Sequence, residues 1–145
     1  MIEGAAGQDT LFFQELLLRS TTTKVINELI HIYYAAITDS VTNSISKSFY
    51  EKYFILEQHR IPFLKREGLF EVYLERRFNY YFINWYLKRL ARVDKNHIRE
   101  AVDALYKIYS LYEKYIENPE RIIKTFVETY KTQNYDRLIA EINDL

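Results

Sequence analysis

The sequence predicts an all-α fold: a compact single-domain bundle of six to eight helices around a central helix at about residues 69–91. Three observations support this prediction. The 145 residues are enough for one domain with a packed core and too few for two comfortable ones. Only three glycines and two prolines are present, so residues that make turns are rare. Apolar residues recur at spacings of three and four, as in amphipathic helices.

The helical domain is expected to begin at residue 9. Residues 1–8 are small and polar, and we interpret them as a flexible leader or tag remnant ahead of a single helical domain at 9–145. Asp9 and Thr10 can cap a short first helix, and Thr22 or Thr23 can cap a second one. The apolar stripe of the second helix consists of Val25, Ile26, Leu29, Ile30, Tyr33, Tyr34 and Ile37. Residues 38–48 are rich in Ser, Thr and Asn and indicate a loop.

The middle of the chain is divided by one proline and one glycine. A third helix is expected at about 47–58, and it should end before Pro62, because a residue that precedes proline avoids the helical region. Pro62 then suits the first turn of a short helix at 62–67, which Gly68 ends. The central helix at 69–91 contains neither glycine nor proline. Its apolar residues cover two sides, Leu74, Phe78, Phe82 and Trp85 on one and Tyr80, Ile83, Leu87 and Leu90 on the other.

Three more helices are expected in the carboxy-terminal third. Asp94 can cap an amphipathic helix that runs from about residue 98 to 116 and ends before Pro119. Pro119 opens the next helix, and a last helix follows Gln133 and Asn134. The apolar stripes of these last two helices are core positions or, as an alternative, a docking face for another protein.

Charge is distributed unevenly along a chain whose net charge is zero. Residues 59–99 contain ten Lys and Arg against four acidic residues, whereas the remainder contains ten against sixteen. On an ideal α-helix, Arg77, Tyr81, Asn84 and Lys88 point the same way and form a narrow polar strip, flanked by Arg60, Lys65, Arg66 and Arg76. Guanidinium and ammonium groups bind phosphate oxygens, and neighbouring rings, including Trp85, can stack on a base. A solvated face, paired with Glu67, Glu71 and Glu75, is the alternative.

Several classes of site lack their required residues. The chain has no cysteine, which excludes disulfides and thiolate metal ligands, and its three histidines make no His-x₃-His pair, so we expect neither a metal nor a cofactor. No Gly-rich phosphate loop, Asp-x-Asp pair or recognisable nucleophile setting occurs, and we therefore expect no catalytic residues. No segment approaches the length of a membrane span. We expect a cytoplasmic protein without a membrane partner.

One pair of residues suggests catalysis as an alternative. Arg92 and His97 are separated by four residues and resemble the Arg-x₄₋₆-His motif of the HEPN family of small all-α ribonucleases. In the HEPN family, the arginine and the histidine of this motif flank the scissile phosphate. The other interpretation is that Asp94 caps the following helix and that His97 lies on its first turn.

Four segments resemble the C-terminal helical domain of the archaeal and eukaryotic primase large subunit, and the related domain of some plasmid primase-polymerases. They are Arg60-Ile61-Pro62-Phe63, Arg76-Arg77-Phe78-Asn79-Tyr80, Trp85-Tyr86-Leu87-Lys88, and Val93-Asp94 leading into the helix from Ile98 to Leu105. The resemblance covers roughly residues 59–110. Because the chain is short, all-α and free of cysteine, it looks most similar to the noncatalytic third subunit of archaeal primases, PriX, which lacks the iron–sulfur cluster of that domain.

The resemblance implies an accessory role in the synthesis of RNA primers during DNA replication. Such a subunit binds the triphosphate of the initiating nucleotide and the 5′ end of the primer, while a partner subunit performs catalysis. Its partners would be the catalytic small subunit, the large subunit, a nucleoside triphosphate, the RNA primer and the DNA template. By position, Arg76, Arg77 and Lys88 would hold phosphates, Arg60 would approach from a preceding loop, and Tyr81 or Trp85 would line the base or sugar. The alternatives are a HEPN-type ribonuclease and a nucleic-acid-binding helical subunit of another complex, such as a small CRISPR effector subunit.

Overall fold

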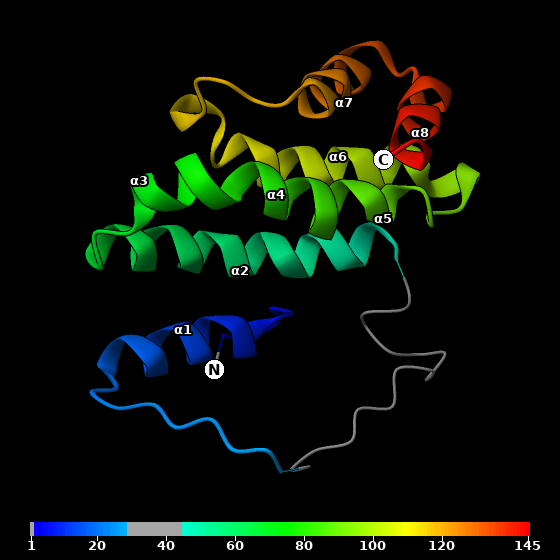
Figure 1. Ribbon diagram of the computed structural model, residues 1–145. Helices are drawn as coiled ribbons and strands as arrows, with labels where there is room; N and C mark the ends of the chain where they lie inside the picture. Colours follow the sequence, from blue (N-terminus) through cyan, green and yellow to red (C-terminus); the bar gives the residue numbers. More distant parts are fainter. Residues whose placement is uncertain (1, 29–44) are drawn as a thin grey trace.

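The computed structural model describes residues 2–28 and 45–145, and in these ranges it contains helices and turns but no strand (Figure 1). The predicted all-α fold is confirmed. The longer helices are α1 (Gln8–Arg19), α2 (Lys47–Arg66), α6 (Ile98–Ser110), α7 (Arg121–Thr132) and α8 (Tyr135–Asn143). The central helix is continuous from Phe70 to Leu90, and short 3₁₀ turns at Lys95–His97 and Glu113–Tyr115 flank α6.

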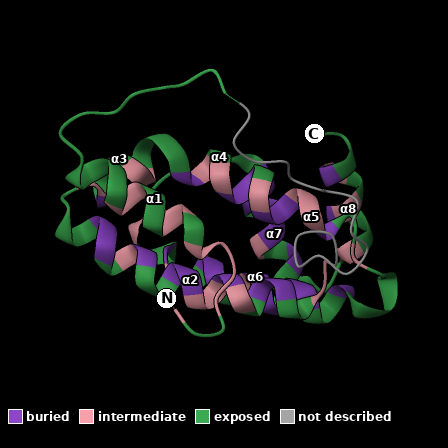
Figure 2. Cartoon of the chain, turned by 90° about the horizontal axis from the view of Figure 1, so that it is seen from below, coloured by how far each residue is buried: buried purple, intermediate pink, exposed green. Residues whose placement is uncertain are grey.

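The helices pack in three layers. α2, the central helix and α6 lie side by side, α7 and α8 cover one side of them, and α1 lies on the opposite side beneath α2 (Figures 1 and 2). Figure 2 shows that buried residues are concentrated on the middle layer, whereas α1 has none. The largest fully buried apolar side chains are Tyr50, Tyr86, Tyr112, Phe49, Phe78, Phe82 and Phe126. In the part of the chain that the structure describes, no helix has both the length and the apolar character that crossing a bilayer requires.

The predicted break before Pro62 is wrong, because α2 continues through it to Arg66. Pro62 cannot donate a backbone hydrogen bond, and a proline inside a helix costs about 3 kcal/mol. The buried positions of α2 nevertheless keep a helical spacing on both sides of the proline: Phe49, Tyr50, Tyr53, Leu56, Glu57, Arg60, Phe63 and Leu64. Pro62 itself is exposed, so its ring disturbs no packing. Burial of this long stripe outweighs the local preference to end the helix.

Gly68 ends α2, as predicted. Its φ of 68° lies in the left-handed region, which residues other than glycine rarely adopt. The N–H of Gly68 donates to the carbonyl of Lys65 at 3.2 Å, and the N–H of Leu69 donates to that of Leu64 at 2.8 Å. These two hydrogen bonds form a Schellman motif, which satisfies the last carbonyls of the helix. The chain then reverses into the central helix.

The central helix departs from regular α-helical geometry at two places. Its short α-helical pieces α3 (Phe70–Tyr73), α4 (Asn79–Tyr81) and α5 (Lys88–Leu90) alternate with π-helical segments at Leu74–Phe78 and Phe82–Leu87. A π turn closes between residues i and i+5, so each residue turns the helix by a smaller angle than in an α-helix. Tyr80, which a regular helix would bury, is consequently 65% exposed.

The amino-terminal residues pack against α2, contrary to the expectation that residues 1–8 form a flexible leader. Ile2, Ala5 and Ala6 contact the core, and the N–H of Ala6 donates to the carbonyl of Lys52 at 3.4 Å. These contacts hold Gly7 at the start of α1.

The second predicted helix is wrong at its beginning, since residues 22–28 are not helical. Val25 is 92% exposed there, and β-branched residues without burial gain little from a helix. The remainder of that helix and most of the loop expected at 38–48 lie outside the described residues.

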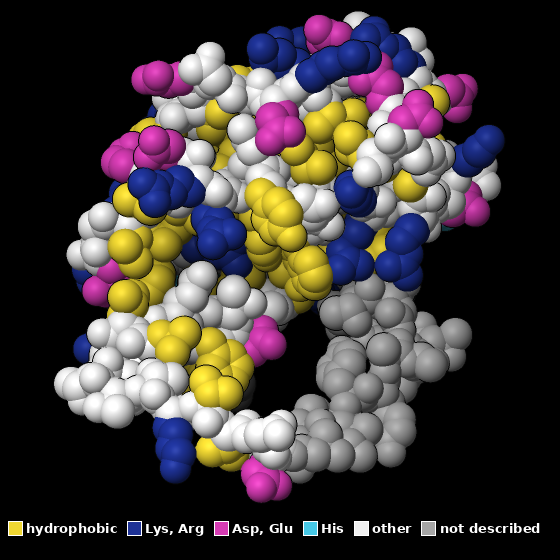
Figure 3. Space-filling model, in the orientation of Figure 1, with side chains coloured by type: hydrophobic (Ala, Val, Ile, Leu, Met, Phe, Trp, Pro, Cys, Tyr) yellow, Lys and Arg dark blue, Asp and Glu magenta, His cyan; other side chains and the backbone are white. Residues whose placement is uncertain are grey.

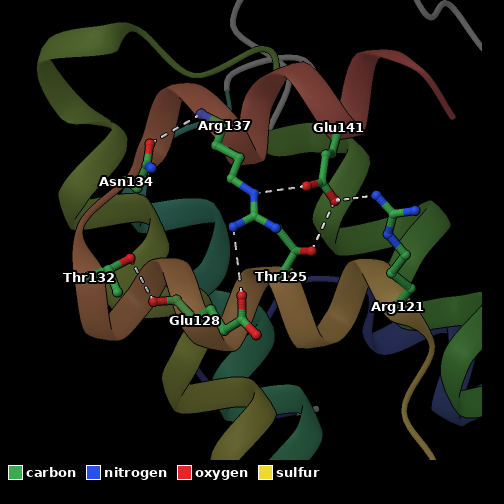
Figure 4. A network of polar contacts seen from close by, with 7 residues as sticks. All are labelled: Arg121, Thr125, Glu128, Thr132, Asn134, Arg137 and Glu141. Carbon is green, nitrogen blue, oxygen red and sulfur yellow. Dashed lines mark hydrogen bonds and ion pairs between the residues drawn. The ribbon is translucent and has the colours of Figure 1, made fainter.

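The carboxy-terminal helices follow the predicted pattern closely. The stripe of α6 is buried from Ile98 to Tyr109, although α6 ends at Ser110 and Ile116 is only half buried. α7 and α8 bury the apolar residues Ile122, Ile123, Phe126, Leu138 and Ile142, so these stripes are core rather than a docking face. Figure 4 shows the polar contacts that join α7 to α8: Glu141 accepts hydrogen bonds from Thr125 Oγ1 at 2.9 Å and from Arg137 Nε at 3.1 Å.

Candidate functional site

A column of aromatic rings and guanidinium groups runs along the central helix. The rings of Tyr81 and Trp85 are stacked, with centroids 6.3 Å apart and planes inclined by 21°. The guanidinium of Arg60 lies 4.7 Å from the Tyr81 ring centroid, and that of Arg89 lies 4.1 Å from the Trp85 ring. Tyr81, Trp85 and Arg89 follow one another at intervals of four residues. The π segment between Phe82 and Leu87 favours this alignment, because wider turns bring residues four apart closer to one line.

A buried ion pair fixes one end of this column. Arg60 and Glu57 are 2% and 1% exposed, and Arg60 Nη1 donates to Glu57 Oε1 at 2.8 Å. Glu57 also accepts hydrogen bonds from the hydroxyl of Tyr86, at 2.5 Å, and from that of Tyr112. The second nitrogen of the guanidinium, Arg60 Nη2, donates to the Tyr81 hydroxyl at 3.4 Å. The carboxylate of Glu57 therefore holds Arg60 against the Tyr81 ring.

Burial keeps the phenols of this network neutral. It raises the pKa of Tyr86 and of Tyr112 well above the ordinary value, and the nearby carboxylate of Glu57 raises both further. Burial likewise raises the pKa of Tyr81, although the charge of Arg60 opposes the shift. The hydroxyls of Tyr86 and Tyr112 thus remain hydrogen-bond donors to Glu57 throughout the neutral pH range.

The two stacked rings border a cleft of about 530 Å³. It lies between the amino-terminal end of α1, α2 and the central helix, and its lining residues are Gly4, Ala5, Ala6, Gly7, Asp9, Thr10, Lys52, Tyr53, Tyr81 and Trp85. Tyr53 contacts Trp85 edge to face, with centroids 5.9 Å apart, and burial raises its pKa to about 12. In the view of Figure 3, hydrophobic side chains lie in the middle of the molecule between groups of Lys and Arg side chains.

Gly7 allows the amino-terminal turn to close over the cleft. Its φ is 68°, and a Cβ atom at this position would lie 2.9 Å from Cε1 of Tyr53. Both the backbone conformation and the close approach to the ring therefore require glycine. The turn that brings residues 4–7 beside Lys52 depends on this residue.

The structure brings only two of the predicted site residues into the cleft, Tyr81 and Trp85. The prediction that Arg60 approaches from a loop is wrong, because Arg60 lies inside α2 and is buried against Glu57. Arg60 is 2% exposed and donates to Glu57 and to the Tyr81 hydroxyl, so it holds the Tyr81 ring in place. This role follows from the helix continuing through Pro62.

The predicted polar strip is divided rather than continuous. Lys88 Nζ donates to the backbone carbonyl of Leu145 at 3.5 Å, and Asn84 Nδ2 donates to the carbonyl of Tyr80 in its own helix at 2.8 Å. The prediction that Arg77, Tyr81, Asn84 and Lys88 point the same way assumed a regular α-helix. The π segment between Tyr81 and Lys88 turns by a smaller angle per residue, and positions seven apart no longer coincide.

The remaining predicted arginines are exposed at the surface. Arg66 pairs with Glu67 at 2.8 Å and borders a different groove, between α1 and α2. Arg76 and Arg77 lie in the first π segment, and their side chains make no ion pair or hydrogen bond within residues 2–28 and 45–145. Arg77 precedes Tyr81 by four residues on the central helix.

Sequence reasoning missed the other residues of this site. Arg89 follows Trp85 by four residues, and this cation–aromatic spacing was a usable signal. Lys52 and Tyr53 come from α2, whose proximity to Trp85 no local pattern indicates. The amino-terminal turn at residues 4–7 was set aside because its composition is typical of an unstructured leader.

The surroundings of His97 fit the capping interpretation. Asp94 Oδ1 accepts a hydrogen bond from the N–H of Asn96 at 2.8 Å, which confirms that Asp94 caps the turn leading into α6. His97 is exposed in that turn. Among the described residues, no three or more His, Asp or Glu side chains lie close enough together to hold a metal ion.

In comparisons with known proteins, no protein-family model, no curated protein and no solved structure matches this chain. The assignment of the cleft therefore depends on its own geometry: two stacked rings, flanking guanidinium groups and one lysine.

Proposed function

We propose that the chain is a noncatalytic primase subunit that binds the initiating nucleoside triphosphate, or the 5′ end of the primer, in the cleft beside Tyr81 and Trp85. The observation that carries the proposal is the alignment of these two rings between the guanidinium groups of Arg60 and Arg89. The ring faces are covered by each other and by these guanidinium groups, so a bound base would pack against the ring edges that line the cleft. Rings already held by the Glu57–Arg60 pair lose little entropy when a base packs against them.

Cations close to the cleft can bind the phosphates. Lys52 lines the cleft itself, and Arg76 and Arg77 are exposed on the same helix as Tyr81. Charge-assisted hydrogen bonds from such groups to phosphate oxygens are about twice as strong as neutral ones. Asp9 also lines the cleft and repels a triphosphate, but its Oδ1 accepts a hydrogen bond from the N–H of Thr10 at 2.9 Å. In the lining of the cleft the charges of Lys52 and Asp9 offset one another, so binding of a triphosphate depends on Arg76 and Arg77 reaching its phosphates.

The context of primer synthesis comes from the resemblance of residues 59–110 to the primase large-subunit domain. In that context, the chain contributes by positioning: holding one nucleotide beside the catalytic subunit removes much of the entropic barrier to the first phosphodiester bond. Formation of the bond and binding of the metal ions belong to the catalytic small subunit. The large subunit and the catalytic subunit are the proposed protein partners.

The fluorescence of Trp85, the only tryptophan in the chain, reports on the cleft directly. We expect ATP and a 5′-triphosphorylated dinucleotide to quench this fluorescence, and both Tyr81→Leu and Lys52→Ala to weaken binding by about tenfold. Asp9→Asn should have the opposite effect on affinity, since it removes a negative charge from the same cleft. The Arg76→Ala, Arg77→Ala double variant tests whether these arginines reach the phosphates.

Arg121→Ala is the matched control, because Arg121 is 88% exposed on α7, on the far side of the molecule from α1. Its affinity for ATP should equal that of the unmodified chain. A chain that binds neither nucleotide, or that binds ATP equally well after Tyr81→Leu, would contradict the proposed site. A site that only binds the charged backbone of nucleic acid would bind any long strand at least as well as a 5′-triphosphate end. Its affinity would also fall as the salt concentration rises.

A further inference from the structure

The amino-terminal arm, which we define as residues 2–19, packs loosely on the rest of the chain. None of the residues of α1 is buried, and Leu11 is the apolar residue of α1 that packs against the core. Its other half-buried residues are polar, among them Gln8, Gln14 and Glu15. Oε1 of Gln14 is shielded from water and has no hydrogen-bond partner among the described residues. The docked arm therefore buries little apolar surface and leaves a polar atom unsatisfied, and both features lower the stability of its docking.

A single backbone hydrogen bond joins the arm to α2 within the described ranges. The N–H of Ala6 donates to the carbonyl of Lys52 at 3.4 Å, which is longer than the usual distance of about 2.7–3.2 Å. Further hydrogen bonds stay inside the arm, such as that from the N–H of Ile2 to Gln8 Oε1 at 3.0 Å. Residues 20–28, which follow α1, are exposed and form no helix. The arm is thus a unit with its own internal bonds, held on α2 by few contacts.

The arm also forms one wall of the cleft. On this side the lining residues are Gly4, Ala5, Ala6, Gly7, Asp9 and Thr10, and on the other side they are Lys52, Tyr53, Tyr81 and Trp85. The two glycines of the arm have left-handed φ, 76° at Gly4 and 68° at Gly7. Glycine permits a wide range of backbone conformations, so the turn between them can change its shape. A ligand in the cleft lies between the arm and the two helices opposite.

We propose that the amino-terminal arm is a clamp, which opens away from α2 to admit a ligand to the cleft and closes on the bound ligand. In the closed state the ligand contacts the arm as well as Tyr81 and Trp85, whereas in the open state it reaches only the central helix and α2. A ligand shifts an equilibrium towards the state that it binds better, so binding favours the closed state. The identity of the ligand, a nucleoside triphosphate, rests on the proposed function, but the opening of the arm does not.

A single thiol beneath the arm measures the opening. The chain contains no cysteine, and Leu56 of α2 is 0% exposed at a point where a Cβ on Gly7 would lie 3.4 Å from its Cδ2. The thiol of Leu56→Cys in the full chain should react with the soluble disulfide reagent DTNB whenever the arm opens. Urea denaturation of the same variant gives the rate that global unfolding alone would allow. We expect a rate at least about tenfold faster than this limit, because local opening costs less free energy than global unfolding.

Leu105→Cys is the matched control, because Leu105 is also 0% exposed but lies on α6. Its thiol should react no faster than global unfolding of that variant allows. Two glycines test whether the arm controls the reaction at residue 56. Gly7→Ala places a Cβ 2.9 Å from the Tyr53 ring and should speed the reaction of Leu56→Cys by about tenfold or more, because it favours the open arm. Gly68→Ala, at the same φ of 68°, should leave that rate unchanged, since its Cβ meets no atom within 4 Å.

ATP supplies the second test. If the arm closes on ATP, the reaction of Leu56→Cys should slow by about tenfold at an ATP concentration ten times the dissociation constant that Trp85 fluorescence gives. A Leu56→Cys thiol that reacts only at the rate of global unfolding overturns the clamp, even where ATP binds. ATP that quenches Trp85 but leaves the reaction rate unchanged also overturns it. Fast reaction in a chain that does not bind ATP supports the opening of the arm and contradicts only the proposed nucleotide site.

Discussion

Arg60→Met tests whether the buried pair of Arg60 and Glu57 holds the candidate site together. The substitution removes the cation from Glu57, which is 1% exposed, and leaves its carboxylate with only the hydroxyls of Tyr86 and Tyr112. Breaking a buried ion pair by removing one partner typically costs about 3–5 kcal/mol, because an uncompensated charge stays in the interior. That is a large share of the roughly 5–15 kcal/mol by which domains are stable. We expect a loss of this size in the free energy of unfolding.

Urea denaturation followed by far-ultraviolet circular dichroism measures this loss. Arg19→Met is the reference variant with which the loss for Arg60→Met is compared. Arg19 makes the analogous pair with Glu15 in α1, but there the two side chains are 69% and 47% exposed. Such a pair contributes about 0.3–0.5 kcal/mol. The two substitutions remove the same side chain from the same kind of pair and differ in burial. Equal losses for Arg60→Met and Arg19→Met would refute the argument that Glu57 and Arg60 form a buried support for Tyr81.

Three other predictions concern single positions and can be measured in the same way. Pro62→Ala should stabilise the chain by about 1–3 kcal/mol, since it restores a backbone donor within α2; an unchanged urea midpoint would show that α2 already compensates for the proline. Gly7→Ala should cost more than Gly68→Ala and should also weaken ATP binding: both glycines have φ of 68°, but only at Gly7 does the added Cβ approach a ring, Tyr53. Equal losses at the two glycines would contradict the close approach. The hydrogen bond from Thr125, together with Arg137, lowers the pKa of Glu141 below its ordinary 4.5, although partial burial opposes the shift. Because the folded pKa is the lower one, Glu141 stabilises the chain above about pH 4.5 and loses this contribution as the pH falls. The thermal midpoint of Glu141→Gln should therefore decrease less than that of the unmodified chain on acidification, and parallel curves would contradict this.

Local sequence patterns predicted the helical fold and most helix ends. The stripe from Ile98 to Tyr109, the left-handed glycine at residue 68 and the capping carboxylate of Asp94 each act within a few residues, so their effects can be read from the chain itself. Pro62 shows the limit of such reasoning. Its local cost is real, but eight buried residues of α2 on both sides of it decide the outcome. Which residues are buried depends on contacts with other helices.

The sequence by itself determined that this chain is a helical bundle, that its basic residues gather between 59 and 99, and that Tyr81 and Trp85 lie among them. Only the tertiary structure decided which of these residues share a site. The π segments rotate Lys88 away from Tyr81, the continuation of α2 buries Arg60, and the packing of residues 4–7 brings Lys52 and the rings to one cleft. The physical reason is that hydrogen-bonding and steric preferences act within one or two helical turns. Burial and close approach arise only when segments distant in the chain pack together.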